Sequence, residues 1–162
     1  MGPNAGSTHG LPVPQPLKSF EKVPDGAGIL TTPEEAKHFV AAAGVDILAP
    51  AVGNMHGLFQ TMVTGAVKKR LDIERIAAIR DAASVFMTLH GGSGTDDDDF
   101  KKAIKARMTI VHVNTEIRLA WRRAMEAVLA ADQSVVPYKL MVPVVVPIQK
   151  VVHARLRLFS SR

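Results

Sequence analysis

The feature that most constrains this chain is a short apolar run that leads directly into a glycine-rich polar loop. Residues 85–89 (VFMTL) are rich in strand-forming side chains, and His90-Gly91-Gly92-Ser93-Gly94 follows them at once. A strand of this kind delivers its last side chain to the rim of a sheet, and the glycines beyond it let the backbone turn sharply and present its N–H groups. A near-copy of the design lies earlier, where residues 45–52 lead to His56-Gly57. We therefore expect the two His-Gly pairs to belong to one site.

Helices and strands are predicted to alternate along the rest of the chain. Thr32, Pro33 and Glu35 form the signature of a capped helix start, and Gly44 is suited to end that helix. The alternation predicts right-handed βαβ units around a parallel sheet. Ligands of such sheets bind at the carboxyl ends of strands, where this chain places its polar and glycine-rich residues. The expected strands cover 45–52, 85–89 and 108–113. The expected helices run from Thr32 to Gly44, over 72–83, over 98–106, from just past Asn114, and after Pro143 and Pro147. Trp121 and Leu156 are expected on the inward faces of the last two helices.

The length and composition fit one globular unit. At 162 residues, with 47% hydrophobic content, the chain can bury a sizeable core. Residues 1–19 hold many prolines and glycines without a helical or strand period, so we expect a disordered extension there and one folded unit over 20–162. The sequence contains no Cys, which excludes disulfides, thiolate metal sites and a cysteine nucleophile.

The formal net charge of +5 raises the question of a nucleic-acid partner. The basic residues are spread along the chain, and one Trp and one Tyr are too few for a base-stacking platform, so we expect no nucleic acid. No apolar run reaches the roughly 20 residues of a membrane span, and the N-terminus lacks a signal-peptide pattern. These features predict a cytoplasmic protein without a membrane partner, with a mildly basic surface or a site for anionic small molecules.

His56 and His90 are the candidate metal ligands. A neutral imidazole on a rigid strand end is a good ligand for zinc. A single histidine before a glycine is commonly structural, but two of them on successive strands favour the metal interpretation. A catalytic zinc normally takes three ligands from protein, one more than this pair supplies.

The loop Gly91-Gly92-Ser93 and the pair Asn114-Thr115 are candidate phosphate contacts. Backbone N–H groups and the Ser93 hydroxyl can hold a phosphate where a loop opens toward a helix. A plain tight turn explains the glycines equally well, and an ordinary helix cap explains Asn114-Thr115. His112, on the third strand, either lines the site or packs. The residues alone leave these alternatives open.

The acidic run 96–99 (DDDD) is expected to be a solvated helix start. Adjacent carboxylates lack the spacing of a calcium loop, and acidic side chains are favoured at a helix N-terminus in any case. His38, on a helix flank, and His153, near the basic C-terminus, are expected at the surface.

Three segments of this chain resemble the class II fructose-bisphosphate aldolases and their tagatose-bisphosphate relatives. They are Val52-Gly53-Asn54-Met55-His56-Gly57, Leu89-His90-Gly91-Gly92-Ser93-Gly94 and Val113-Asn114-Thr115-Glu116. Residues 21–24 (EKVP) and 31–36 (TTPEEA) add support, and the resemblance extends over about 20–159. It implies an α/β fold that is a partial (β/α)8 TIM barrel, about the last three βα units plus the C-terminal helices.

The resemblance also implies roles for individual residues. His56 and His90 would be two of three histidines that bind a catalytic divalent metal, usually Zn2+. The metal would act as a Lewis acid in the reversible aldol cleavage of a ketose 1,6-bisphosphate to dihydroxyacetone phosphate and glyceraldehyde 3-phosphate, a step of glycolysis and gluconeogenesis. The implied contacts to the substrate and its phosphate are Gly57, Gly91, Gly92, Ser93, His112, Val113, Asn114 and Thr115.

The family's catalytic aspartate and first metal histidine lie together in an early-strand motif, and this sequence contains no His-x-Asp-His. We therefore expect the C-terminal part of an aldolase, without a catalytic residue of its own and inactive alone. Three parallel strands leave two open edges and exposed apolar area. That exposure predicts a homo-oligomer or association with a full-length aldolase subunit. The alternative is a non-catalytic remnant that binds sugar phosphates or another subunit.

Overall fold

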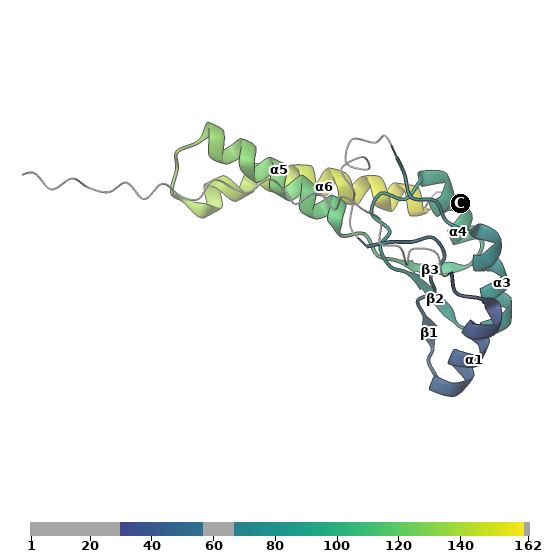
Figure 1. Cartoon of the computed structure of the whole chain (residues 1–162). Helices are drawn as coiled ribbons and strands as arrows, with labels where there is room; N and C mark the ends of the chain where they lie inside the picture. The colour runs from purple at the N-terminus through teal and green to yellow at the C-terminus, as the bar shows by residue number, and fades with distance from the viewer. Residues whose placement is uncertain (1–29, 57–66, 161–162) are drawn as a thin grey trace, which may run out of the picture.

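The computed structural model describes residues 30–56 and 67–160 (Figure 1). The extension expected over 1–19 lies outside these residues, as does Gly57. Three strands and five helices are described: α1 (Pro33–Ala43), β1 (Ile47–Leu48), α3 (Ile73–Ala83), β2 (Phe86–Leu89), α4 (Asp97–Lys105), β3 (Met108–Val111), α5 (Thr115–Ala131) and α6 (Pro137–Ser160).

The three strands form a parallel sheet in the order β1-β2-β3. Helices α1, α3 and α4 lie along one side of it in Figure 1. Between sheet and helices, the side chains of Met87 and Leu89 pack with those of Ile76, Ile79 and Phe100, all fully buried. The prediction of an α/β fold with a parallel sheet is confirmed, and the order of helices and strands is the expected one.

Local sequence signals set the ends of the first two helices. Thr32 caps α1 by accepting a hydrogen bond from the Glu35 N–H at 3.2 Å, while the Glu35 carboxylate accepts one from the Thr32 N–H at 2.8 Å. Gly44 ends the helix in the left-handed conformation. Asp72 caps α3 through the Arg75 N–H, and this bond lowers the pKa of the Asp72 carboxyl. The predicted helix start at Thr32 is thus confirmed.

The first strand is much shorter than predicted, because only Ile47 and Leu48 of the expected run 45–52 pair with β2. Pro50 has no N–H to donate to a sheet. Beyond it, the Ala51 backbone bonds instead to Thr31, through the Thr31 N–H at 2.9 Å and the Thr31 hydroxyl at 2.9 Å. The chain therefore leaves the sheet early and approaches His56 as a loop.

Part of the sheet is apolar and uncovered within the residues that the structure describes. Phe86 on β2 is 60% exposed, and its register partner Ile47 on β1 is 46% exposed. These two side chains form an apolar patch at the amino-terminal end of the paired strands. The exposed apolar area expected of this sheet is therefore present.

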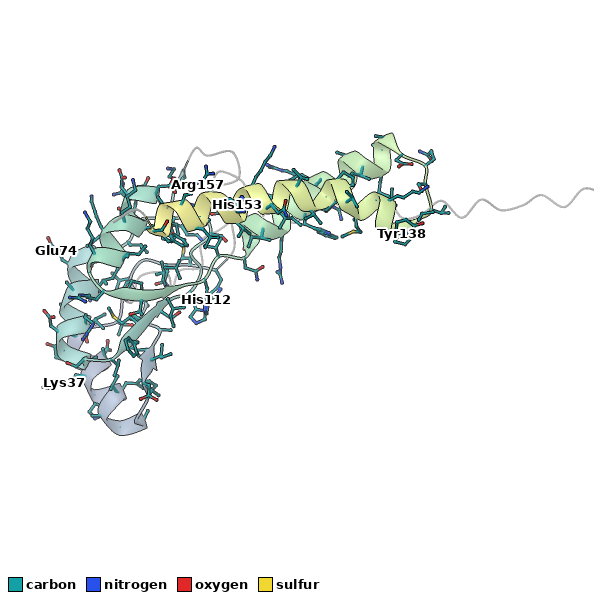
Figure 2. The ribbon with its side chains drawn as sticks, turned by 180° about the vertical axis from the view of Figure 1, so that it is seen from behind. Lys37, Glu74, His112, Tyr138, His153 and Arg157 are labelled. Carbon is teal, nitrogen blue, oxygen red and sulfur yellow. The ribbon has the colours of Figure 1, made fainter. Side chains whose placement is uncertain are left out.

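Helices α5 and α6 form a hairpin that projects away from the sheet (Figure 1). Tyr138 lies at its far end (Figure 2). The last helix was expected to follow Pro143 and Pro147, but α6 runs through both prolines. Trp121 and Leu156 are 41% and 60% exposed, so the prediction that they face inward is wrong. A two-helix hairpin has room for only a narrow buried seam, and Val144 is fully buried in α6. None of the described helices has the length and apolar character needed to cross a membrane.

The acidic run 96–99 is only partly solvated. Asp96 caps α4 as expected, but Asp99 is 1% exposed. Its carboxylate accepts hydrogen bonds from Arg70 Nε at 2.7 Å, Arg70 Nη2 at 2.9 Å and the Leu71 N–H at 2.9 Å. A carboxylate in the first turn of a helix can turn toward the core when a guanidinium and a backbone N–H satisfy it. Asp99 thus anchors the segment before α3 to α4.

We expect Asp99→Ala to lower the free energy of unfolding by about 2 kcal/mol, because the buried Leu71 N–H loses its acceptor. Urea denaturation of the purified chain measures the change. Arg122→Ala is the matched control, since it breaks the exposed Arg122–Glu126 pair in α5. The anchoring role of Asp99 is contradicted if both variants unfold at the same urea concentration.

The loops that follow β1 and β2 touch each other through their backbones. Gly91 has φ +65°, and a Cβ placed on it would lie 2.3 Å from the Met55 carbonyl oxygen and 2.6 Å from its carbon. The Asn54 side chain links the same loops, because its Nδ2 donates to the His90 carbonyl at 3.0 Å while its Oδ1 accepts from the Val52 N–H at 2.8 Å. Only glycine fits position 91.

Gly91→Ala should therefore destabilise the chain by more than the roughly 1–2 kcal/mol that a left-handed conformation alone costs. Gly44→Ala provides the comparison, because Gly44 has almost the same φ of +64° with no atom within 4 Å of the added Cβ. The two variants are compared by urea denaturation. Equal losses at both positions would show that the two loops do not touch in solution.

Candidate functional site

His56 and His90 lie close together after neighbouring parallel strands. His90 follows β2 directly, and His56 lies in the loop that follows β1. Their ring centroids are 5.9 Å apart and the ring planes are inclined by 39°. His56 is exposed and His90 half-buried, so both rings are within reach of solvent. The two histidines of the His-Gly pairs therefore lie side by side, while Gly57 lies outside the described residues.

His112 adds a third imidazole to the group. It follows β3, and its ring meets that of His90 edge to face with centroids 4.6 Å apart. The two Nδ1 atoms are 3.3 Å apart, so one donates and the other accepts. Figure 2 shows His112 projecting outward beside the end of the sheet. When Nδ1 of His90 is engaged in this way, its Nε2 is the nitrogen left to bind a metal.

The donor chemistry fits two positions of a metal site. A Zn–N bond is about 2.0–2.1 Å long, and the separation of the His56 and His90 rings leaves room for one ion between them. Among residues 30–56 and 67–160, no group of three or more His, Cys, Asp or Glu side chains is arranged to hold a metal ion. The described residues would therefore provide part of a coordination shell.

The glycine-serine loop after His90 is joined to the start of α5. Ser93 is buried, and its hydroxyl oxygen accepts hydrogen bonds from the Asn114 N–H at 3.1 Å and the Glu116 N–H at 3.4 Å. The Gly92 N–H donates to the His112 carbonyl at 3.0 Å. The Asn114 side chain makes no capping bond, so the ordinary cap considered for Asn114 is wrong and Ser93 supplies the cap.

Two backbone donors at this junction are still available for a ligand. Within the described part of the chain, the N–H groups of Ser93 and Thr115 have no hydrogen-bond partner. They lie where the positive end of the α5 dipole favours an anion. The Val113 side chain packs against the core, so only its backbone is offered to the site. A phosphate interpretation of the loop is compatible with these donors.

Lys69 is a buried residue of the site region that the sequence does not reveal. Its ammonium donates to the carbonyl oxygens of Met55, at 2.5 Å, and Gly91, at 3.1 Å. Burial lowers the pKa of Lys69 to about 8, against the opposing attraction of Glu116. In the sequence it stands between Lys68 and Arg70, both exposed, as one of three adjacent basic residues. No local pattern separates the buried member from its neighbours.

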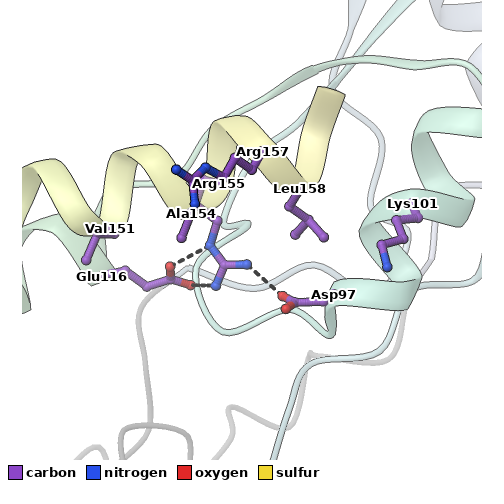
Figure 3. A pocket seen from close by; sticks show the side chains of 8 residues that line it. All are labelled: Asp97, Lys101, Glu116, Val151, Ala154, Arg155, Arg157 and Leu158. Carbon is purple, nitrogen blue, oxygen red and sulfur yellow. Dashed lines mark hydrogen bonds and ion pairs between the residues drawn. The ribbon is translucent and has the colours of Figure 1, made fainter. Parts of the chain in front are cut away.

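Arg155 of α6 joins the start of α5 to the start of α4 (Figure 3). Its guanidinium donates to both carboxylate oxygens of Glu116, at 2.8 and 3.0 Å, and to Asp97 at 2.7 Å. Burial disfavours the charge of Arg155, but the bonds to Glu116 and Asp97 outweigh it and raise the pKa. Glu116 also accepts a hydrogen bond from the Gly94 N–H at 2.8 Å. The last helix thereby supports the glycine-serine loop.

The chain is similar to aldolases of class II. A family model described as fructose-bisphosphate aldolase class-II matches residues 6–162. The structure of the YdjI aldolase from Escherichia coli K12 is 32% identical, with a TM-score of 0.68 over 82% of this chain and 46% of that one. A putative fructose-1,6-biphosphate aldolase from Coccidioides immitis is 32% identical, with a TM-score of 0.68 over 83% of this chain and 44% of that one.

A fructose-bisphosphate aldolase from Campylobacter jejuni shares the fold at 16% identity, with a TM-score of 0.64 over 85% of this chain and 49% of that one. The chain thus spans less than half the length of the solved structures it matches. The family match covers almost the whole sequence, and it agrees with the resemblance seen in the His-Gly segments. This chain belongs to the class II fructose-bisphosphate aldolase family.

Proposed function

We propose that this chain supplies part of a class II aldolase active site, with His56 and His90 as metal ligands and the glycine-serine loop as a phosphate contact. The reaction is the reversible cleavage of a ketose 1,6-bisphosphate to dihydroxyacetone phosphate and glyceraldehyde 3-phosphate. The observation that carries the proposal is the placement of two imidazole rings 5.9 Å apart in the loops that follow two neighbouring parallel strands, near the N-terminus of α5. We also propose that the chain forms part of a TIM barrel and that it acts in the cytoplasm.

Each described residue has a defined task in this scheme. A bound divalent metal, usually Zn2+, supplies a Lewis acid that polarises a ketone oxygen. His56 and His90 hold the ion, and His112 keeps His90 in one orientation through the Nδ1 contact. The N–H groups of Ser93 and Thr115 would hold the substrate phosphate, with Gly91, Gly92, Val113 and Asn114 beside them after β2 and β3. Gly57, which lies outside the described residues, is a further phosphate contact of the proposal.

The rest of the coordination shell and the catalytic base must come from residues outside those described. The exposed apolar side chains of Ile47 and Phe86 support association with another polypeptide, either a second copy or a full-length aldolase subunit. The same surface supports the alternative, a non-catalytic module that binds sugar phosphates or another subunit. Measurements of metal binding and of turnover distinguish the partial active site from the non-catalytic module.

The metal half of the proposal predicts zinc binding that depends on both histidines. His56→Ala and His90→Ala are each expected to weaken zinc affinity at least tenfold, because either change leaves one imidazole of the pair. Competition against a coloured chelator measures the affinity of the purified chain. His38→Ala and His153→Ala are the controls, since both histidines are exposed and lie on α1 and α6, outside the loops of His56 and His90. Equal zinc affinity in all four variants would rule out the proposed ligands.

The catalytic half predicts turnover only when the shell is completed. Fructose-bisphosphate cleavage is measured with added zinc for the chain alone and after mixing with a full-length class II aldolase whose counterparts of His56 and His90 are replaced by alanine, so that the partner has no activity of its own. We expect no chelator-sensitive cleavage by the chain alone, because the described residues include no third ligand. Chelator-sensitive turnover by the isolated chain, abolished by His90→Ala, would contradict the proposal that the rest of the coordination shell lies outside the described residues. Binding of dihydroxyacetone phosphate without turnover in any mixture would favour the non-catalytic module.

A further inference from the structure

Lys69 is a buried charge that the proposed chemistry does not use. It is 3% exposed, although Lys68 and Arg70 on either side of it are exposed. Lysine is almost never fully buried unless its ammonium is paired or hydrogen-bonded, because removing the charge from water is costly. The position of Lys69 therefore calls for a function that an apolar side chain would not fulfil.

The hydrogen bonds of Lys69 reach both histidine loops. Its Nζ donates to the Met55 carbonyl, one residue before His56, and to the Gly91 carbonyl, one residue after His90. Its backbone is attached to the second of these loops, since the Lys69 N–H donates to Gly94 at 2.9 Å and its carbonyl accepts from the Asp96 N–H at 3.1 Å. One residue thus connects the two loops through its main chain and its side chain.

The two loops need a cation at this point. Gly91 brings its backbone against that of Met55, so closely that a Cβ would lie 2.3 Å from the Met55 oxygen. The carbonyl oxygens of both residues converge on the same ammonium. Two carbonyl dipoles that converge in a part-buried place repel each other unless a hydrogen-bond donor stands between them. The ammonium of Lys69 therefore sets how closely the loops approach.

We propose that Lys69 is a positioning residue that holds the loops of His56 and His90 at the separation at which both imidazoles bind one divalent metal ion. The role rests on the proposed function, because it assumes that the two histidines are ligands. Lys69 itself touches neither the metal nor the substrate. It acts on the Met55 and Gly91 carbonyls, each one residue from a ligand.

The loops keep a second connection when Lys69 is replaced. Asn54 still donates to the His90 carbonyl and accepts from the Val52 N–H. We therefore expect Lys69→Met to fold with looser loops, so that the effect on metal binding can be measured. Lys68→Met is the matched control. It removes the neighbouring positive charge, which is exposed and paired with Asp96 at 3.2 Å.

The test measures zinc affinity, the urea midpoint and, in the metal-free chain, the nuclear Overhauser contact between the rings of His56 and His90. We expect Lys69→Met to weaken zinc affinity 10- to 100-fold, the loss typical of residues that orient metal ligands, and to abolish the ring contact. Lys68→Met should leave all three quantities unchanged. Unchanged zinc affinity and ring contact in folded Lys69→Met would overturn the proposal, even if its urea midpoint falls.

Chemical rescue separates the ammonium from the rest of the side chain. The chain has no cysteine, so Lys69→Cys carries a unique thiol that is alkylated in urea before refolding. Aminoethylation restores an ammonium at lysine length, and ethylation of the same thiol gives the matched side chain without it. Zinc affinity should recover only in the aminoethylated protein. Equal affinity of the two alkylated proteins would overturn the proposal, and it also decides the case if Lys69→Met fails to fold.

The metal-free ring contact distinguishes failure of this inference from failure of the proposed function. If wild-type zinc binding does not depend on His56 and His90, the metal site is wrong, and the positioning role for metal falls with it. A ring contact that still depends on the ammonium would then support a role of Lys69 in holding the two loops together without a metal. If the ring contact does not depend on the ammonium, the positioning role of Lys69 is overturned whether or not zinc binds.

Discussion

The site region depends on the contact between the loops that follow β1 and β2. Gly91 lies against the Met55 backbone, Asn54 donates a hydrogen bond to the His90 carbonyl, and Lys69 donates hydrogen bonds to the Met55 and Gly91 carbonyls that converge there. A side chain at position 91 would push the loops apart, and without the ammonium the close approach would leave two part-buried carbonyls facing each other. The separation of the two imidazoles is a consequence of this packing.

The same loop is supported from its far side by helices that come later in the chain. Ser93 caps α5, Glu116 accepts from the Gly94 N–H, and Arg155 of α6 holds Glu116 and Asp97 together. The Arg155 guanidinium also lies 5.5 Å from the centre of the buried Phe100 ring. A residue near the C-terminus thus stabilises the backbone beside His90. The hairpin of α5 and α6 therefore has a structural connection to the site, although most of its length projects away from the sheet.

Sequence reasoning predicted the elements whose signals are local. The capping box at Thr32, the end at Gly44 and the strand that leads to His90 depend on neighbouring residues, and all three are present. The strand at 45–52 was overestimated because Pro50 and Thr31, which are 19 positions apart in the chain, together divert it from the sheet. Asp99 and Lys69 look like solvated charges in the sequence. Their burial depends on partners 29 and 22 positions away, Arg70 and Gly91, which no local pattern contains.

The contact between the loops of His56 and His90 bears on how further metal ligands from another polypeptide would join these two histidines. If His56 and His90 bind a metal ion as proposed, the protein contacts between their loops would meet the ordering cost of this half of the shell on folding. Another polypeptide that covers Ile47 and Phe86 and contributes a further ligand would then bind more tightly with zinc present. Thermodynamic linkage requires zinc to bind more tightly, by the same factor, when that polypeptide is present. Under the proposal, association and metal affinity are two measures of one coupling, and Lys69 would affect both through the geometry of the preformed half.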